Sequence, residues 1–288
     1  MSIIYIPASR SGKSIRRLSC PQKSGRQQQG QLWSNLKVIC DLLKVSYSPR
    51  ENDGTLFQHV QFKAGQRVHA TGNRFDTFHI VNSGFIKTVV VDELGTDQVL
   101  GFPMKGDILG LDAIDTGYYV SEAIALSDCD LILMPFKKLG GLARTHFELE
   151  SFLFEVISRE LSREREIISM LGGLGAEAKV ARFLLSLSNR FAVMGYSDKV
   201  FNLRMTRQEI GSYLGITLET VSRALTAFKR LDLITVNRRT IGIRNAAVLK
   251  ELRRLAPSRM RARPIGNAWP QGALIQRSAA QPLMVAHD

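Results

Sequence analysis

The spacing of the apolar positions changes along this chain of 288 residues. Between residues 60 and 135 the apolar positions fall into short β-prone runs, such as TFHIV and GFIKTVVV, with glycines between them. Short strands separated by turn residues are typical of an antiparallel roll or barrel. Farther along the chain, apolar residues recur every three or four positions, which is the spacing of helices. The pattern therefore predicts an α+β protein with an N-terminal antiparallel β-roll and helices after it.

Helices are predicted on both sides of the roll. A short amphipathic helix is expected at residues 31–48, before the roll. A long helix at residues 147–171 carries one apolar stripe and a polar opposite side. The segment 172–175 contains three glycines, which we interpret as a flexible joint before another helix at residues 176–191. The polar residues of the long helix include Ser158, Arg159, Ser162, Arg163 and Arg165.

Residues 206–230 carry the pattern of two short helices joined by a tight turn. Thr206 and Glu209 have the spacing of a capping box, which starts a helix. Gly215 supplies the backbone freedom that a sharp turn between helices needs. Thr217 is placed to cap the second helix. The residues of this second helix that we expect in the core are Val221, Leu225 and Phe228.

Another face of the second helix is polar. Glu219, Ser222 and Arg223 recur at helical spacing and should project together. An arginine fork matches guanine O6 and N7, a carboxylate accepts from cytosine N4, and a hydroxyl serves a base or a phosphate. For an isolated Glu/Arg pair, a solvated helix face with no role in recognition is the simpler interpretation. The whole pattern instead favours a helix-turn-helix that reads DNA.

A small hairpin, or wing, is predicted after the second helix. Residues 233–236 and 240–243 are β-rich and flank the polar corner Asn237-Arg238-Arg239. The basic residues at its tip should be able to touch phosphate. The DNA contacts that we predict besides the reading trio are Thr206, Arg207, Thr217, Arg238 and Arg239.

With these motifs the sequence resembles the FNR branch of the bacterial CRP/FNR regulator family, over about residues 60–255. In that branch a Glu-x-x-Ser-Arg signature on the recognition helix reads a TTGAT half-site, and the signature stands here from Glu219 to Arg223. The resemblance implies a homodimeric regulator that binds a TTGAT-N4-ATCAA-like inverted repeat and recruits or obstructs RNA polymerase. It also implies a cyclic-nucleotide-binding-like β-roll, whose turn pattern is matched at Gly65, Gly84, Gly106-Asp107 and Gly110.

The apolar stripe of the long helix is interpreted as a dimer seam, although such stripes are most often core packing. A two-fold symmetric operator needs a two-fold symmetric protein, with readers about 34 Å apart. Glu164 interrupts the seam, where two carboxylates would repel across the axis or be neutralised by neighbouring arginines. The resemblance puts an aspartate at this position, linked there to the control of dimerisation. The predicted seam residues are Ile157, Leu161, Glu164, Ile168 and Leu171.

The formal charge of +13 is concentrated in two tails. Residues 1–30 hold six basic residues and no acid, while residues 256–288 hold four basic residues and one acid, which together make +9. Both tails lack periodicity, so we expect disorder and a salt-sensitive, non-specific attraction to DNA. The parts between them are predicted as a roll domain at 31–142, a dimerisation helix with hinge at 143–175, and a winged helix-turn-helix domain at 176–255.

The sequence gives no sign of a membrane segment. No apolar run approaches the roughly 20 residues that a membrane span requires. The N-terminal apolar residues precede the positive charges, which is the wrong order for a secretory signal. We therefore expect a cytoplasmic protein.

Members of the family are known to bind a cyclic nucleotide or an iron–sulfur cluster, and each needs residues that this chain lacks. A cyclic nucleotide needs a Gly-Glu pair on one turn and an Arg-Ser pair farther on, whereas Gly110-Leu111 and Val120-Ser121 stand here. A buried phosphate would lack its charge partner, so cyclic AMP is not expected. An iron–sulfur cluster needs four thiolates. Cys40 lies close to the family's last N-terminal cluster cysteine, but its companions are absent and Ile132 occupies the internal ligand position.

Haem remains open as a third group that the protein could bind. The candidate ligands are His59, His69, His79 and His146, by residue type alone, and each is more simply an ordinary surface or core histidine. The cysteines, which are Cys20, Cys40 and Cys129, show no CxxC spacing. Cys40 and Cys129 are interpreted first as small buried side chains. No cofactor is therefore predicted.

The expected function is gene regulation under low-oxygen or redox conditions, as the resemblance implies. One alternative keeps the class and changes the input, to a haem-linked sensor of nitric oxide or carbon monoxide. Another makes the roll a ligand-binding module whose output is a protein partner. An enzyme is not expected, because no nucleophile-base constellation, phosphate loop or metal spacing is visible in the sequence.

Overall fold

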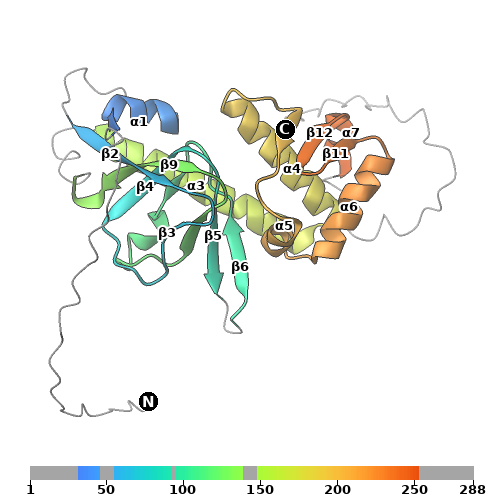
Figure 1. The fold of residues 1–288 in the computed structure, drawn as a ribbon, viewed down its shortest axis with the longest axis horizontal. Helices are drawn as coiled ribbons and strands as arrows, with labels where there is room; N and C mark the ends of the chain where they lie inside the picture. The colour runs from blue at the N-terminus through green and yellow to red at the C-terminus, as the bar shows by residue number, and fades with distance from the viewer. Residues whose placement is uncertain (1–31, 46–54, 92–94, 139–147, 253–288) are drawn as a thin grey trace, which may run out of the picture. The chain divides into compact units, whose positions relative to one another are not determined.

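The computed structural model describes residues 32–45, 55–91, 95–138 and 148–252. The predicted tails and His146 lie outside these ranges, as does Cys20. Within them the chain forms a β-roll followed by helices and a second, smaller sheet (Figure 1). The predicted α+β class is confirmed. No helix in the described ranges is long and apolar enough to cross a membrane.

The roll consists of two antiparallel sheets. One has the strand order β1-β2-β9-β4-β7 and the other has the order β3-β8-β5-β6. Buried positions alternate with more open ones along most of β2, whereas β9 is buried on both faces at Leu131 and Ile132. The strands are β1 (Trp33–Asn35), β2 (Leu56–Phe62), β3 (Arg67–His69), β4 (Thr77–Ser83), β5 (Ile86–Val91), β6 (Asp97–Gly101), β7 (Ile108–Leu109), β8 (Glu122–Ala125) and β9 (Cys129–Pro135), and a 3-10 turn η1 (Leu111–Ala113) follows β7.

Large apolar side chains cover both faces of the five-stranded sheet, and they pack against residues 36–43 on one face and against the other sheet on the opposite face. Phe57, Phe78, Ile80, Leu131 and Ile132 are at most 1% exposed. Burying a side chain of this size contributes about 1.5–3 kcal/mol. These residues come from β2, β4 and β9, which are neighbours in one sheet. The core of the roll therefore rests on strands that are far apart in the sequence.

Gly84 shows why the predicted turn glycines matter. Its φ of 96° is in the left-handed region, which favours glycine. A Cβ at this position would lie 2.5 Å from Cys129 Sγ and 2.6 Å from the Asp128 carbonyl oxygen. Glycine is required here both by the backbone conformation and by the close approach of the turn before β9.

The helix predicted at residues 31–48 is shorter than expected. Residues 33–35 form β1, which pairs with β2, and α1 (Leu36–Leu43) begins only after it. Asn35 caps α1, because its side chain accepts a 3.0 Å hydrogen bond from Val38 N. Lys44 ends α1 with a φ of 52°. The sequence pattern missed this strand because only the distant β2 pairs with it.

A buried chain of polar side chains joins β1, β2 and β9. Ser34 Oγ lies 2.7 Å from His59 Nε2, and His59 Nδ1 lies 2.8 Å from Asp130 Oδ2. Asn82 of β4 donates a 2.7 Å hydrogen bond to the same Asp130 oxygen. The order serine, histidine, carboxylate is that of hydrolytic triads. Here Ser34 is only 8% exposed, so we interpret these hydrogen bonds as a structural link between the edge strand β1 and the rest of the sheet.

The long predicted helix is α3 (Glu148–Gly173), and the next helix is α4 (Ala176–Val193). The expected glycine joint is narrower than predicted, because Gly172 and Gly173 belong to α3. A glycine inside a helix costs only about 1 kcal/mol, so a long helix tolerates it. The break falls at Leu174 and Gly175, where Gly175 has extended backbone (φ −65°, ψ 160°). Only this short segment is available to act as a joint.

The polar side of α3 contacts the chain's own roll. Arg163 Nη1 donates a 2.6 Å hydrogen bond to Asp107 Oδ1, and Arg190 of α4 pairs with the other oxygen of this carboxylate. Arg159 Nη2 donates to the Lys44 carbonyl oxygen at 3.2 Å. Asp107 is 7% exposed, so its charge depends on these partners. Ile157 and Leu161 of the apolar stripe line a cavity together with Arg163 and roll residues, yet both stay partly exposed.

The C-terminal part combines helices with a three-stranded antiparallel sheet in the order β10-β12-β11. The predicted wing is confirmed as the hairpin of β11 and β12, and the core residues predicted on the second helix are each at most 3% exposed. The elements are β10 (Val200–Asn202), α5 (Arg207–Leu214), α6 (Leu218–Arg230), β11 (Ile234–Asn237), β12 (Thr240–Ile243) and α7 (Ala246–Leu252).

The buried polar chain gives a stability prediction. Replacing Asp130 with Ala leaves His59 Nδ1 and the Asn82 amide without their acceptor in the interior of the roll. Asp130→Ala should lower the free energy of unfolding by about 2–3 kcal/mol, measured by urea unfolding followed by circular dichroism.

The matched control is Asp128→Ala. Asp128 pairs with Lys63 at 2.7 Å, but the two side chains are 67% and 74% exposed. Exposed ion pairs contribute at most about 1 kcal/mol. Equal losses for the two variants would contradict the role assigned to Asp130.

Candidate nucleic-acid interface

The two helices of the predicted reader begin with the caps that the sequence indicates. Thr206 Oγ1 accepts a 3.1 Å hydrogen bond from Glu209 N, and Glu209 Oε2 accepts a 2.7 Å bond from Thr206 N. This is the full capping box. Thr217 Oγ1 accepts a 3.2 Å bond from Thr220 N at the start of α6. Both helix starts are therefore fixed by their own side chains.

Close packing at the turn sets the angle between α5 and α6. Gly215 ends α5 with a φ of 61°, as the sequence predicts. Gly211 was not singled out in the sequence, yet a Cβ there would lie 2.7 Å from the Ile216 carbonyl oxygen. Only glycine lets the α5 backbone approach the turn so closely. The spacing of four residues between two glycines was the signal that could have identified it.

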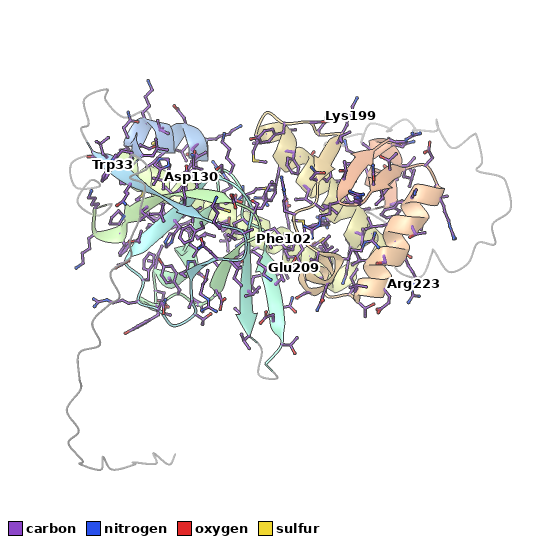
Figure 2. The ribbon with its side chains drawn as sticks, viewed as in Figure 1. Trp33, Phe102, Asp130, Lys199, Glu209 and Arg223 are labelled. Carbon is purple, nitrogen blue, oxygen red and sulfur yellow. The ribbon has the colours of Figure 1, made fainter. Side chains whose placement is uncertain are left out.

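The reading trio lies together on the open side of α6. Glu219 and Arg223 are exposed, and Ser222 is half-buried. Figure 2 shows Arg223 at the surface of α6. Arg207 Nη1, from the start of α5, donates a 3.2 Å hydrogen bond to Ser222 Oγ. This bond connects the first helix to the reading face of the second.

The carboxylate of the trio is held in its ionised form. Hydrogen bonds from its own backbone N–H and from Thr217, together with the nearby Arg223 cation, lower the pKa of Glu219. An ionised carboxylate only accepts hydrogen bonds, and a guanidinium group only donates them. The face of α6 therefore presents an acceptor, a hydroxyl and a donor fork in one row.

The wing tip is basic and exposed. Arg238 and Arg239 form the two-residue turn between β11 and β12, and both side chains are open to solvent. Leu203 N, just after β10, donates a 2.8 Å hydrogen bond to the Arg239 carbonyl oxygen. The tip is thus anchored to the strand that leads into α5.

The predicted seam is an exposed apolar stripe on α3. Ile157, Leu161, Ile168 and Leu171 are between 38% and 69% exposed, and Glu164 is exposed beside them. Phe154, which the sequence analysis did not select, is 67% exposed. Apolar residues at this spacing and exposure mark an interaction surface more often than a solvated face.

A cavity of about 750 Å³ borders the roll turn that would hold a cyclic phosphate. Its roll side includes Gly110, Leu111 and Ser121, and neither this turn nor the following one supplies an arginine or a glutamate. Arg163 and Arg190 also line it, but both already contact Asp107. Arg182 of α4 also lines the cavity, but the roll turn itself supplies neither the arginine nor the glutamate that a cyclic phosphate would need there.

Cys40, Cys129, His59 and His69 are buried and His79 is half-buried, and this loss of solvent sets their chemistry. It raises the pKa of Cys40 to about 12, with a smaller effect of Asp41, so this thiol stays protonated. Burial also lowers the pKa of His69 to about 3 and that of His79 to about 4. Across the described ranges no three His, Cys, Asp or Glu side chains are grouped so that they could hold a metal ion.

Comparisons with known proteins agree with both halves of this architecture. A model of the cyclic nucleotide-binding domain matches residues 59–146, and a model of the Crp-like helix-turn-helix domain matches residues 178–252. The solved structure of FixK2 from Bradyrhizobium japonicum is similar, with a TM-score of 0.63 and 27% identity over 69% of this chain and 98% of that one.

Curated relatives identify the family. The transcriptional regulatory protein btr of Bordetella pertussis is 34% identical over 200 residues, which cover 69% of this chain and 83% of that protein. The fumarate and nitrate reduction regulatory protein of Escherichia coli K12 is also 34% identical, over 69% of this chain and 80% of that protein. These relatives are regulators and not enzymes, in agreement with the sequence. The chain belongs to the CRP/FNR family of DNA-binding transcription regulators.

Proposed function

We propose that this protein is an FNR-type regulator that binds a TTGAT-N4-ATCAA-like inverted repeat as a homodimer. The observation that carries the proposal is the row of Glu219, Ser222 and Arg223 on the open face of α6, with Ser222 held by Arg207. The names of the fumarate and nitrate reduction regulators support a role in low-oxygen or redox control. The output would be recruitment or obstruction of RNA polymerase in the cytoplasm.

Each residue of the trio has its own role in this proposal. Arg223 donates to guanine O6 and N7, and Glu219 accepts from cytosine N4. Ser222 fixes the register, because its hydrogen bond to Arg207 couples the reading face to α5. Thr206, Arg207 and Thr217, at the two helix starts, and Arg238 and Arg239, at the wing tip, contact phosphates.

The dimer would form along α3. Its exposed residues Ile157, Leu161, Ile168 and Leu171 would pack against the same residues of a second copy. Two readers related by the two-fold axis then face half-sites about one turn of DNA apart. The chain parts in this proposal are a roll domain at 31–142, a dimerisation helix with its joint at 143–175 and a reader domain at 176–255, between tails at 1–30 and 256–288.

DNA recognition should not depend on an oxygen-labile group. The chain has three cysteines. The two that the structure describes are both buried, Cys40 in α1 and Cys129 at the start of β9. Protein purified in air should bind a duplex with TTGAT-N4-ATCAA at least about 1,000-fold more tightly than a scrambled duplex at the same salt, measured by fluorescence anisotropy. Equal affinities for the TTGAT-N4-ATCAA and scrambled duplexes, both in air and under anaerobic reducing conditions, would overturn the proposed site.

Removing the arginine fork should relax the specificity. Arg223→Ala should cost about 1–3 kcal/mol on the inverted repeat and reduce the preference at one base pair, measured on duplexes with single substitutions. Arg230→Ala is the matched control, since Arg230 is an exposed arginine in the last turn of the same helix. Equal losses for Arg223→Ala on specific and scrambled DNA would show that Arg223 reads no base.

The carboxylate in the seam should oppose dimerisation. Glu164→Leu removes a charge that would be repeated across the two-fold axis and adds apolar surface to the stripe. It should tighten the dimer by at least about 1.4 kcal/mol, which is tenfold, as measured by sedimentation equilibrium. Arg165→Leu adds similar apolar surface off the stripe and should leave the dimer constant unchanged. Weaker association of Glu164→Leu would place the seam elsewhere.

A further inference from the structure

The first helix of the predicted reader contacts an edge strand of the roll. β6 is the last strand in the order β3-β8-β5-β6, so it is an edge of the sheet that the structure describes. Ser212 Oγ of α5 accepts a 2.9 Å hydrogen bond from Val99 N and donates a 3.2 Å bond to the Asp97 carbonyl oxygen. The backbone groups of an edge strand need such partners. One serine hydroxyl therefore pairs with both a donor and an acceptor of this edge.

An ion pair joins the start of α5 to the neighbouring strand β5. Lys87 Nζ donates a 2.8 Å hydrogen bond to Glu209 Oε1, and the two side chains are 18% and 16% exposed. The other carboxylate oxygen of Glu209 closes the capping box with Thr206. Burial alone would raise the pKa of Glu209, but the hydrogen bonds from Lys87 and Thr206 outweigh it and lower the pKa. The same ionised carboxylate thus caps α5 and binds the roll.

Further contacts lie on both sides of Ser212. Gln98 Nε2 donates a 2.6 Å hydrogen bond to the Ser212 carbonyl oxygen. The ring centroid of Phe102 lies 5.2 Å from that of Tyr213 in α5 and 6.0 Å from that of Phe183 in α4. The polar contacts form what we call the α5 clamp, which consists of Lys87, Gln98 and Val99 of the roll and Glu209 and Ser212 of α5.

The clamp uses a face of α5 that recognition leaves free. Glu209 and Ser212 are three residues apart, so they lie on one face of the helix. Ile210 and Leu214, on another face, are buried at 1% and 0% exposure. The reading trio belongs to α6 and stays on its open side. The reader can therefore be held by the roll and present its trio at the same time.

The chain connection alone does not fix the position of the reader. Only Leu174 and Gly175 stand between α3 and α4. Arg190 holds the far end of α4 through Asp107 and the Phe102 carbonyl oxygen. The clamp holds α5, the helix directly before α6. The direction of α6 relative to α3 therefore depends on the clamp.

We propose that the α5 clamp sets the spacing between half-sites that the dimer accepts, so that Lys87, Gln98 and Ser212 determine specificity without touching DNA. The inference rests on the proposed homodimer on an inverted repeat. With α3 paired along the two-fold axis, a fixed angle between α3 and α6 gives one separation between the two readers. Each added base pair moves a half-site by about 3.4 Å and turns it by about 35°, which two clamped readers do not follow.

The test is the affinity for inverted repeats with different spacers. Wild-type protein should bind TTGAT-N4-ATCAA at least about tenfold more tightly than the N3 or N5 duplex, measured by fluorescence anisotropy. In Lys87→Met and in Ser212→Ala this ratio should fall below about threefold. The affinity of both variants for a duplex with a single TTGAT half-site should stay within about twofold of the wild-type value, because the trio is unchanged.

Arg67→Met is the matched control. Arg67 pairs with Glu122 at 2.8 Å, between two strands of the roll, so its loss removes an ion pair without touching the clamp. This variant should keep the wild-type spacer ratio. Circular dichroism and thermal unfolding would show that all three variants fold.

Hydrogen exchange at Val99 measures the clamp without DNA. The Val99 amide donates to Ser212 Oγ and not to Lys87. Lys87→Met should nevertheless raise the exchange rate of this amide at least about tenfold, measured by nuclear magnetic resonance, because a loosened α5 no longer protects the edge. Arg67→Met should leave the rate unchanged.

Three results would overturn the proposal. The first is a wild-type spacer ratio in folded Lys87→Met and Ser212→Ala. The second is wild-type protein that binds the N3, N4 and N5 duplexes equally. The third is a loss on the single half-site as large as that on the inverted repeat, since it would indicate damage to the reader itself.

The measurements separate this proposal from the proposed function. If wild-type protein fails to distinguish the TTGAT duplex from a scrambled duplex, base reading by α6 is wrong. The exchange rate of Val99 then decides the clamp alone. A rate in Lys87→Met equal to that of the wild type would overturn the clamp, and a raised rate would support it.

Discussion

The close approach of two backbone segments at Gly211 fixes the direction in which the protein can read DNA. A side chain there would collide with the Ile216 carbonyl oxygen, 2.7 Å from the position of a Cβ. Because α5 can lie against the turn, α6 buries Val221 and Phe228 and leaves the opposite face open. The acceptor, hydroxyl and donor of the reading trio occupy that face. The proposed chemistry of recognition therefore depends on a packing constraint in the turn.

Exposed apolar residues on α3 favour the association of two chains. The helix contacts its own roll through arginines such as Arg159 and Arg163 and buries Val156 and Met170, while Ile157, Leu161, Ile168 and Leu171 stay between 38% and 69% exposed. Their exposure is consistent with a second copy as the occupant. Family membership supports this assembly, since inverted repeats require two readers related by symmetry. The carboxylates of the two Glu164 residues would then repel each other only when the two chains associate.

Local patterns predicted local structure well. The capping box at Thr206, the turn at Gly215 and the hairpin around Arg238 depend on residues close in sequence, and the structure has all three. The long-range pairings could not be predicted. Nothing in the spacing of Ser34, His59 and Asp130 indicates a hydrogen-bonded chain, because the sheet topology alone brings β1, β2 and β9 together.

In the candidate site too, some features were predictable from the sequence and others required the structure. The reading trio lies on one helix and was visible in the sequence, whereas Arg207 was predicted as a DNA contact without its bond to Ser222. Arg204 gave no signal, since the wing-tip residues with which it lines a groove, 237–240, are more than 30 residues away in the sequence. For the roll, the missing arginine and glutamate were visible in the sequence, while the engagement of Arg163 and Arg190 by Asp107 required the structure.

The most direct test of the central claim is selection of binding sites from a pool of random duplexes by the purified, full-length protein. The account predicts enrichment of an inverted repeat whose half-sites carry TTGAT and whose centres lie about one helical turn apart. Enrichment of an unrelated sequence, of a single half-site without symmetry, or of no sequence at all would contradict the account.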